Sequence, residues 1–190
     1  YKIITAPLGD DIITELKAGD KVLISGTIYT ARDAAHGRMC EALQRGESLP
    51  FDIKGQIIYY AGPCPPKPGA VAGSFGPTTS GRMDKYAPML IERGLKGMIG
   101  KGDRGSEVIG AMKAHRAVYF AAIGGLGAYI ANVVLCQQVI AYADLGAEAV
   151  MKLTVKDFPV IVAIDSEGNN LYSTEPGKYE NAFSIIRSSK

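Results

Sequence analysis

Residues 73–84 have the sequence Gly73-Ser74-Phe75-Gly76-Pro77-Thr78-Thr79-Ser80-Gly81-Arg82-Met83-Asp84. They form a Gly- and Pro-rich loop that runs into a helix predicted over residues 80–93. Glycine lets a backbone approach a ligand closely, and the unpaired N–H groups at a helix start attract an anion. Arg82 adds a planar fork of donors that suits a carboxylate or a phosphate. The stretch predicts an anion-binding loop with hydroxyl groups beside it; an ordinary capped helix after a flexible loop is the alternative.

Strands and helices alternate on both sides of this loop. Apolar and β-branched runs predict strands at residues 1–5, 21–26, 56–60, 98–100, 117–123, 139–142, 149–155 and 160–165. Periodic apolar residues predict helices at residues 10–17, 31–44, 80–93, 106–115 and 128–134. We therefore expect an α/β fold with a mixed sheet, an additional β layer and flanking helices. Residues 62–69 would also suit a linker, but no charged or Ser-rich tract accompanies them, so we expect a single domain over residues 1–190.

The bulk composition excludes several classes of protein. Of 190 residues, 47% are hydrophobic and 21% are charged, which is an ordinary globular composition. A formal net charge of +2 without a Lys/Arg block argues against nucleic acid as a partner. The most apolar run, residues 117–136, is interrupted by glycines and an asparagine, which argues against a membrane span. The start of the chain shows no secretory signal, so we expect a cytoplasmic protein.

The cysteines give no sign of a disulfide framework or a metal site. Cys40, Cys64 and Cys136 are odd in number and far apart, which fits a reducing compartment. They lack CxxC spacing, so an iron–sulfur or other metal site wholly within this chain is not expected. We interpret them as buried structural thiols.

Two further segments carry cationic side chains. Arg32 and His36 follow a predicted strand and share one face of a helix start, with Asp33 beside them. They would suit a carboxylate-binding arginine with an Asp–His pair in support; a capping acid and a surface arginine explain the same spacing slightly better. Lys101 comes directly after a short apolar strand, where sites in α/β proteins gather, although a solvated turn is nearly as good an explanation.

Other catalytic motifs are missing from the sequence. There is no GxxxxGK[ST], HExxH or GxSxG, and two histidines leave little for a Ser–His–Asp hydrolase. The glycines of Gly124-Gly125-Leu126-Gly127 do not match a dinucleotide fingerprint and predict a tight turn. What remains is a site with Arg32, Arg82, Lys101 and the hydroxyls of residues 78–80. It predicts a small dianionic or polyanionic substrate.

The same segments match one known family in chain order. The matching residues are Ala31-Arg32-Asp33-Ala34-Ala35-His36, Gly76-Pro77-Thr78-Thr79-Ser80-Gly81-Arg82-Met83-Asp84, Lys101-Gly102, Ile123-Gly124-Gly125, Glu148-Ala149-Val150-Met151-Lys152 and Val155-Lys156-Asp157-Phe158-Pro159. From about residue 2 to residue 165 the chain resembles the β subunit of two-subunit class I fumarate hydratases and L(+)-tartrate dehydratases. That subunit is equivalent to the C-terminal domain of single-chain class I fumarases. The motif over residues 76–84 is highly specific.

The resemblance implies a swivelling β/β/α fold and an iron–sulfur-dependent hydro-lyase. In that family three cysteines of the α subunit bind a [4Fe–4S] cluster, whose open iron acts as a Lewis acid on the substrate. The resemblance therefore implies that this chain alone binds no metal and is inactive without an α subunit. We expect a homodimer or a heterotetramer, a small dicarboxylate substrate, and neither nucleic acid nor a membrane as partner.

The resemblance also implies roles for the matching residues. The residues that would bind substrate carboxylates are Arg32, Arg82, Lys101 and Gly76. Thr78 would be the base that removes a proton from the carbon beside a carboxylate, and Thr79 is the alternative. A hydroxyl is a poor base at neutral pH, so neighbouring cations and exclusion of water would have to assist it. The supporting residues would be Asp33, His36 and Ser80, with Asp33 and His36 also suited to contact the α subunit.

Three functional hypotheses follow for this chain. The leading one is reversible hydration of fumarate to (S)-malate, and the second is dehydration of L(+)-tartrate to oxaloacetate. The third is a non-catalytic anion-binding or assembly module on the same scaffold. One departure from the family pattern is Asp103, since single-chain relatives commonly have Asn after Lys-Gly. No role is assigned to the tail over residues 167–190.

Overall fold

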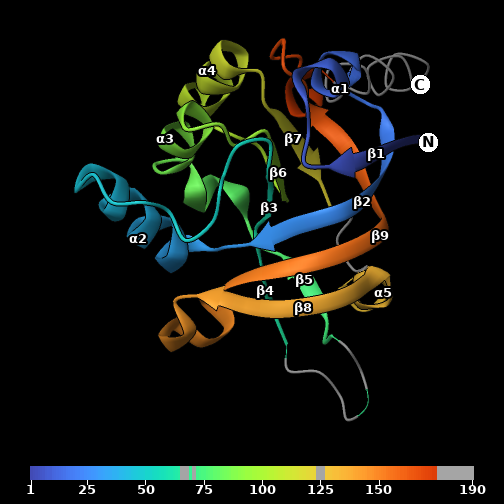
Figure 1. Ribbon diagram of the computed structural model, residues 1–190. Coiled ribbons are helices and arrows are strands. Elements are labelled where there is room, and N and C mark those ends of the chain that lie inside the picture. Colours follow the sequence, from blue (N-terminus) through green and yellow to red (C-terminus); the bar gives the residue numbers. More distant parts are fainter. Residues whose placement is uncertain (65–68, 70–71, 123–126, 175–190) are drawn as a thin grey trace, which may run out of the picture.

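A mixed sheet forms the centre of the molecule (Figure 1). The computed structural model describes residues 1–64, 69, 72–122 and 127–174. The strands of the sheet are β1 (Lys2–Ala6), β2 (Lys21–Thr30), β3 (Ile57–Tyr59), β6 (Gly97–Gly100), β7 (Val118–Ala121), β8 (Val134–Ala141) and β9 (Val150–Ile164). Within the described residues they pair in the order β1-β2-β3-β6-β7-β9-β8. A separate antiparallel pair consists of β4 (Ala61–Pro63) and β5 (Phe75–Pro77).

The pairing of β9 closes part of the sheet into a ring. The neighbours in the series β1, β2, β3, β6 and β7 are parallel. β9 runs antiparallel to β2 along one edge and to β7 and β8 along the other. β2, β3, β6, β7 and β9 therefore form a closed circuit, to which β1 and β8 are attached. Figure 1 shows β2, β9 and β8 side by side on one face of the molecule.

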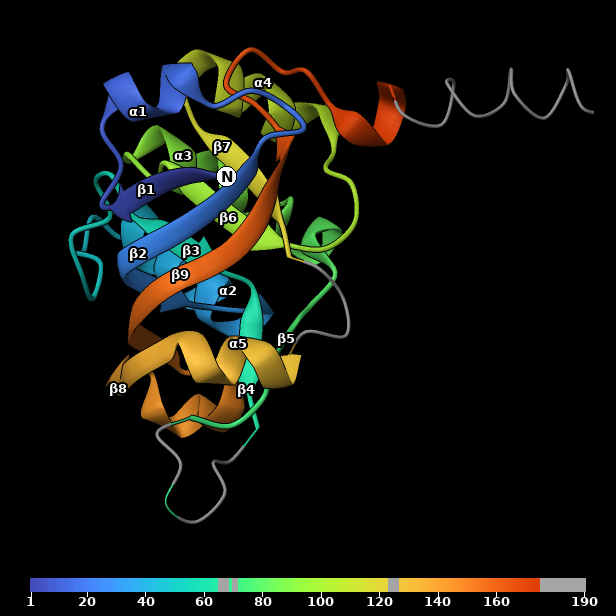
Figure 2. The same ribbon diagram turned by 90° about the vertical axis from the view of Figure 1, so that its right-hand side faces the viewer.

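Helices cover the outside of this ring. They are α1 (Asp10–Glu15), α2 (Asp33–Gln44), α3 (Ala87–Glu92), α4 (Ser106–His115) and α5 (Gly127–Val133), with the 3-10 helices η1 (Ser80–Met83) and η2 (Ala143–Glu148). α2, α3 and α4 lie on one side of β3 and β6, at the left of Figure 1. α5 packs against β5 and β9 on another side, as Figure 2 shows.

Apolar side chains form two cores, because successive residues of a strand point to opposite faces. On β3, Tyr59 belongs to the first core and Ile58 to the second. On β7, Phe120 belongs to the first core and Tyr119 to the second. The first core takes side chains from every strand of the ring and fills its interior. The second packs the outer face of the ring against α2, α3 and α4.

The structure confirms a mixed α/β architecture with a mixed sheet and additional strands. The predicted helices at 10–17, 31–44, 106–115 and 128–134 are α1, α2, α4 and α5. The prediction of one helix over residues 80–93 is wrong. The segment is divided into η1 and α3, because Pro88 cannot donate to the carbonyl of Asp84 and its ring would clash with that carbonyl. Because η1 has only four residues, it does not provide the helix N-terminus on which the predicted anion-binding loop depended.

The predicted strands at 149–155 and 160–165 form one strand, β9, of 15 residues. The break inferred between them is a bulge, at which Asp157 adopts a positive φ of 55° and its N–H donates to Ser25 Oγ at 3.1 Å. The strand predicted at 139–142 begins earlier, since β8 starts at Val134. Exposed Leu135 and Gln138 hide this strand from a pattern-based prediction, because β8 is half-solvated at the edge of the sheet.

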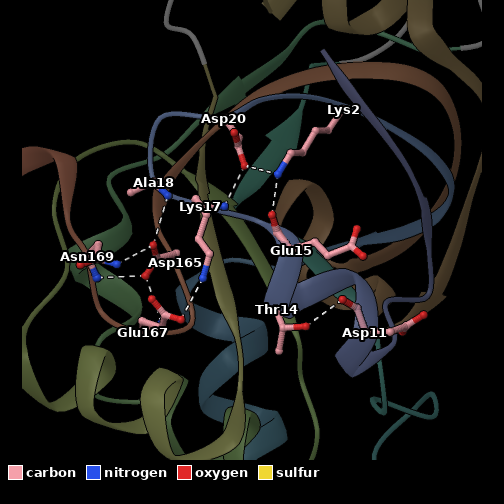
Figure 3. Close-up of polar contacts among 10 residues, drawn as sticks. All are labelled: Lys2, Asp11, Thr14, Glu15, Lys17, Ala18, Asp20, Asp165, Glu167 and Asn169. Carbon is pink, nitrogen blue, oxygen red and sulfur yellow. Dashed lines mark hydrogen bonds and ion pairs between the residues drawn. The ribbon is translucent and has the colours of Figure 1, made fainter.

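The turn after β9 ties the end of the described chain to its beginning, as Figure 3 shows. The Asp165 carboxylate is buried and accepts hydrogen bonds from the N–H groups of Ala18, Glu167 and Asn169 at 3.2, 3.0 and 3.0 Å. The Asn169 amide adds a fourth hydrogen bond at 2.8 Å. The first residues of the tail are therefore part of the fold.

Some predictions fall on residues outside the described ranges. These are residues 65–68 of the loop over 62–69, residues 124–126 of the predicted turn, and the tail from residue 179. In the part of the chain that the structure describes, no helix is long and apolar enough to cross a membrane.

Candidate active site

The candidate residues gather where parallel strands end. β2, β3, β6 and β7 run in the same direction, so their carboxyl ends lie at one edge of the ring. Arg32 and Asp33 follow β2, and Lys101 follows β6. Thr78 joins the same edge, because its N–H donates to the carbonyl of Tyr60 directly after β3, at 2.7 Å. Ligands in α/β proteins commonly bind at such an edge.

The threonine loop and the lysine loop are joined through their backbones. Thr79 and Lys101 form an isolated parallel bridge. The N–H of Ser80 donates to the Lys101 carbonyl at 2.9 Å, and the N–H of Lys101 donates to the Thr78 carbonyl at 3.3 Å. Two segments that are more than 20 residues apart in the sequence are thereby held side by side. The structure thus brings Thr78, Thr79 and Lys101 together.

The three hydroxyls of this loop differ in exposure. Thr78 is partly exposed and Thr79 is exposed, whereas Ser80 is fully buried. Ser80 Oγ lies 2.9 Å from the hydroxyl of Tyr119. A ligand at the surface can therefore reach Thr78 and Thr79 but not Ser80. Gly76 is exposed, and a Cβ added there would meet nothing within 4 Å, so packing within this chain does not require glycine at this position.

Arg82 is linked to the start of α2. Its Nη2 lies 2.6 Å from Asp33 Oδ2, and the Arg82 side chain is 52% exposed. The N–H directions do not make an aligned hydrogen bond, so the contact is an ion pair. The interpretation of Asp33 as a capping acid is wrong, because Arg32 is the N-cap residue of α2 and no side chain caps that helix.

Arg32 lies on the other side of the α2 start. Its Nη2 is 3.4 Å from Glu148 Oε1, and Glu148 Oε2 also accepts the N–H of Ala34 at 3.2 Å. Gly62 makes room for this arginine, since a Cβ there would lie 3.1 Å from Arg32 Nη1. Glu148 belongs to a segment that matched the family, but no spacing in the sequence pairs it with Arg32. The pairing depends on η2 lying against α2.

His36 does not face the candidate site's surface. Its ring is fully buried, and Nδ1–H donates to the Arg32 carbonyl at 2.9 Å. Burial lowers the pKa of His36 to about 4, so the ring is neutral at physiological pH. Its ring and the Tyr60 ring form a T-shaped pair with centroids 5.2 Å apart. The structure therefore places His36 beneath Arg32, inside this chain.

Arg104 is a buried cation that sequence reasoning missed. Its side chain has 0% exposure, and its Nε donates to Asp84 Oδ1 at 2.7 Å. The guanidinium lies over the rings of Tyr60 and Tyr119, 5.3 and 5.1 Å from their centroids. Asp84 also accepts the N–H of Gly105 at 2.6 Å. Asp84, the last residue of the motif over 76–84, thus anchors the lysine loop. The one signal in the sequence for this ion pair is an acidic residue at the end of the motif and an arginine in the lysine loop.

Asp103 is the residue that departs from the family pattern, and its hydrogen-bond partners are not the threonines of the candidate site. Its Oδ1 accepts the N–H of Arg104 at 2.7 Å and the side-chain amide of Asn170 at 2.8 Å. Within the described residues, the Asp103 carboxylate therefore stabilises the lysine loop and links it to Asn170. Asn170 belongs to the tail to which the sequence assigned no role.

The thiols are only partly as predicted. Cys40 is buried, and burial raises the pKa of its thiol to about 11, so it is an inert structural thiol. The prediction of burial is wrong for Cys64 and Cys136, which are exposed. Over residues 1–64, 69, 72–122 and 127–174, no three His, Cys, Asp or Glu side chains gather as a metal ion would require.

Comparison with known proteins identifies the family of this chain. The family model described as "Fumarase C-terminus" matches residues 4–175. The chain belongs to this family. The fumarase C-terminus match includes the threonine loop, the lysine loop and both candidate arginines.

Similar proteins fall into two kinds. The chain is 40% identical over 163 residues to "Fumarate hydratase 2" of Leishmania major, covering 85% of this chain and 29% of that protein. It is 38% identical over 162 residues to "Fumarate hydratase class I, aerobic" of Escherichia coli K12, covering 84% and 30%. It is 42% identical over 181 residues to the "Putative L(+)-tartrate dehydratase subunit beta" of Methanocaldococcus jannaschii, covering 92% and 93%. The chain thus spans less than a third of the two hydratases and nearly all of the β subunit. Both kinds of relative are hydro-lyases by name.

Proposed function

We propose that this chain is the β subunit of an iron–sulfur-dependent hydro-lyase that converts fumarate to (S)-malate reversibly. The observation that carries the proposal is the backbone pairing of the threonine loop with the lysine loop, beside Arg82 and Arg32. It places hydroxyls and cations together at the edge of the ring. That combination suits a dicarboxylate which gains or loses a proton beside a carboxylate. The similarity to class I fumarate hydratases supports this substrate.

Substrate carboxylates would be held by Arg32, Arg82 and Lys101. Lys101 is exposed. Arg82 is 52% exposed, and among the described residues its ion pair is with Asp33, in a contact that water weakens. A carboxylate with bidentate geometry can replace Asp33 on Arg82. Gly76, exposed in β5, leaves open space in which a substrate can approach the backbone. The dianion would thus be recognised by charge and by the planar forks of the arginines.

Thr78 would be the group that takes the proton from the carbon beside the carboxylate. Of the three hydroxyls, Ser80 is buried, which leaves Thr78 with Thr79 as the alternative. An isolated threonine hydroxyl is too weak a base for this step. Arg82 and Lys101 would stabilise both the alkoxide and the negative charge that develops on the substrate. Asp33 and His36 would hold Arg82 and the start of α2 in place.

A [4Fe–4S] cluster is implied by the family resemblance, and we place it on the partner α subunit. When bound, it would supply a Lewis acid for the substrate hydroxyl. The described part of this chain does not fit the role of its holder, because no three potential ligands gather there. This chain would supply binding and proton transfer.

The active species would therefore be a complex. A relative that the chain matches over 93% of its length is named as a subunit β, which supports an α-subunit partner. We propose that residues 1–190 act as one swivelling catalytic domain at the subunit boundary, in a cytoplasmic homodimer or heterotetramer.

The test is reconstitution with an α subunit under anaerobic conditions. The complex should hydrate fumarate, and Thr78→Ala should lower kcat by at least ~100-fold. Thr78→Ser, which keeps a hydroxyl, should recover most of that loss. A kcat loss in Thr79→Ala alone would transfer the role of base to Thr79. Turnover of neither fumarate nor malate would overturn the proposal.

L(+)-tartrate is the second candidate substrate. A relative that is covered over 93% of its own length is named for L(+)-tartrate, which differs from malate by one hydroxyl. Comparison of kcat/KM for malate and L(+)-tartrate with the same complex decides between them. If Thr78→Ala and Arg82→Ala leave turnover of both unchanged, the chain is a non-catalytic anion-binding module.

A further inference from the structure

The threonine loop and the lysine loop meet above a buried tyrosine. Ser80 ends the threonine loop, and Gly102 follows Lys101 in the lysine loop. Tyr119 on β7 contacts both: its hydroxyl is 2.8 Å from the Gly102 carbonyl and 2.9 Å from Ser80 Oγ. One phenol therefore spans the two segments that carry the proposed base and the proposed cation.

The direction of these hydrogen bonds follows from their chemistry. A carbonyl oxygen can only accept, so the Tyr119 hydroxyl must donate to Gly102. Each hydroxyl has one proton, so Ser80 must in turn donate to the Tyr119 oxygen. Ser80 O–H, Tyr119 O–H and Gly102 C=O thus form a chain with one fixed polarity. The Ser80 proton points away from the surface where a substrate would lie.

Burial makes this row of hydrogen bonds rigid. Tyr119 and Ser80 both have 0% exposure, so water cannot replace either partner. Burial raises the pKa of Tyr119, which keeps the phenol protonated. The Arg104 guanidinium covers the ring at 5.1 Å from its centroid. The tyrosine therefore has one defined position between the loops.

The surrounding backbone is shaped for the same arrangement. A Cβ at Gly100 would lie 2.0 Å from Ser80 Oγ, so only glycine leaves room for the serine. Gly102 has a φ of +84°, which turns the chain sharply after Lys101. A Cβ at Gly102 would lie 3.9 Å from Thr79 Cγ2, so the anchored residue sits directly beside the second threonine.

We infer that Tyr119 is a positioning residue, whose hydroxyl fixes the lysine loop against the threonine loop and so sets the distance between Lys101 and the base. The inference rests on the proposed function and deepens it. Catalytic groups displaced by about 1 Å can lose ~100-fold in rate. Loss of the hydroxyl should therefore lower kcat more than it raises KM, because substrate can still bind the exposed cations Arg82 and Lys101.

The variants to compare are Tyr119→Phe and Ser80→Ala in the reconstituted complex. Tyr119→Phe keeps the ring and its contact with Arg104, and removes both hydrogen bonds. We expect kcat to fall ~10- to 100-fold with KM within ~3-fold of wild type. If the hydroxyl chain acts as a unit, the double variant should be no slower than Tyr119→Phe alone.

Val118→Ala is the matched control for a general loss of stability. Val118 is the neighbouring residue on β7, but its buried side chain lies in the first core, on the opposite face. It should lower the Tm at least as much as Tyr119→Phe while kcat stays within ~2-fold of wild type. Equal kcat losses in the two variants would overturn the inference.

Amide hydrogen exchange of the full chain separates this inference from the proposed function. Tyr119→Phe should accelerate exchange at the Ser80 and Lys101 amides at least ~10-fold relative to Val118→Ala, since these amides join the loops. Faster exchange with an inactive wild-type complex would overturn the proposed function and keep Tyr119 as the anchor of the two loops. Unchanged exchange, or an unchanged kcat in an active complex, would overturn the inference.

Discussion

At the scale of single residues, the charged side chains in and beneath the candidate site are buried to very different degrees. Arg82 and Lys101 face solvent, whereas Arg104 beneath them has a side chain with 0% exposure. Exposed cations remain free to take a substrate, and their ion pairs contribute little stability. A buried guanidinium needs its carboxylate partner, because an unpaired buried charge is costly. The two layers should therefore respond differently to mutation.

Asp84 and Arg104 test this difference. Asp84→Asn leaves Arg104 buried without its carboxylate, and we expect the free energy of unfolding to fall by about 3–5 kcal/mol. Arg104→Met should cost less, because Asp84 is 24% exposed and water can solvate it. Urea unfolding of both variants measures the difference. A smaller loss for Asp84→Asn than for Arg104→Met would contradict the assignment of Arg104 as the dependent partner.

His36 should make stability fall below neutral pH. The pKa of His36 is lowered from 6.5 to about 4, mainly by burial and also by the nearby Arg104 charge, while the Arg32 carbonyl and the Asp33 charge act in the opposite direction. Between these two pH values the unfolded chain binds a proton that the folded chain does not, so stability is lost as pH falls from about 6.5 to about 4. The full loss should be about 3 kcal/mol. Urea unfolding at several pH values measures it, and a curve for His36→Gln should be flatter in this window; identical slopes would exclude His36 as the cause.

At the scale of elements, β9 is one long strand where the sequence pattern predicts two. Two apolar runs separated by Lys156 and Asp157 predict two strands, yet β2 binds both along its length. The bulge absorbs the extra residue, and Ser25 accepts the N–H that the bulge leaves over. Gly26 lies beside this bulge on β2, with a φ of +103°. The need for glycine at position 26 therefore comes from the contact of β2 with β1 and β9, and the sequence around Gly26 does not reveal it.

Gly26→Ala should destabilise this junction. A Cβ there would lie 2.6 Å from the Ala6 carbonyl oxygen, in a backbone region that alanine avoids. We expect a loss of about 1–3 kcal/mol in the free energy of unfolding. Gly110→Ala in α4 is the control, because its Cβ would meet nothing within 4 Å and helix propensity should add about 0.5–1 kcal/mol. Thermal unfolding should show Tm changes of opposite sign, and a Gly26→Ala protein as stable as wild type would refute this account.

At the scale of the whole molecule, the edge of the ring has cations and hydroxyls but no gathered metal ligands in its described part. Under the proposed function, the iron of the complex belongs to the α subunit. Oxidation followed by a chelator should abolish turnover of the reconstituted complex. The Tm of this chain, measured alone before and after the same treatment, should not change. Iron and sulfide analysis after separating the subunits is the direct check: stoichiometric iron on this chain would contradict the assignment.

The sequence by itself determined the α/β class, most helices, and the family through residues 76–84. These features depend on local periodicity and on a motif, both of which are contiguous in the chain. Tertiary structure alone decided that Ser80 turns inward, that Arg82 pairs with Asp33, and that Tyr119 links Ser80 to Gly102. Such contacts join residues at least 17 positions apart, and their energies depend on burial, which a single sequence does not specify. The sheet is the physical reason, because the parallel pairing of β2, β3, β6 and β7 brings their carboxyl ends to one edge.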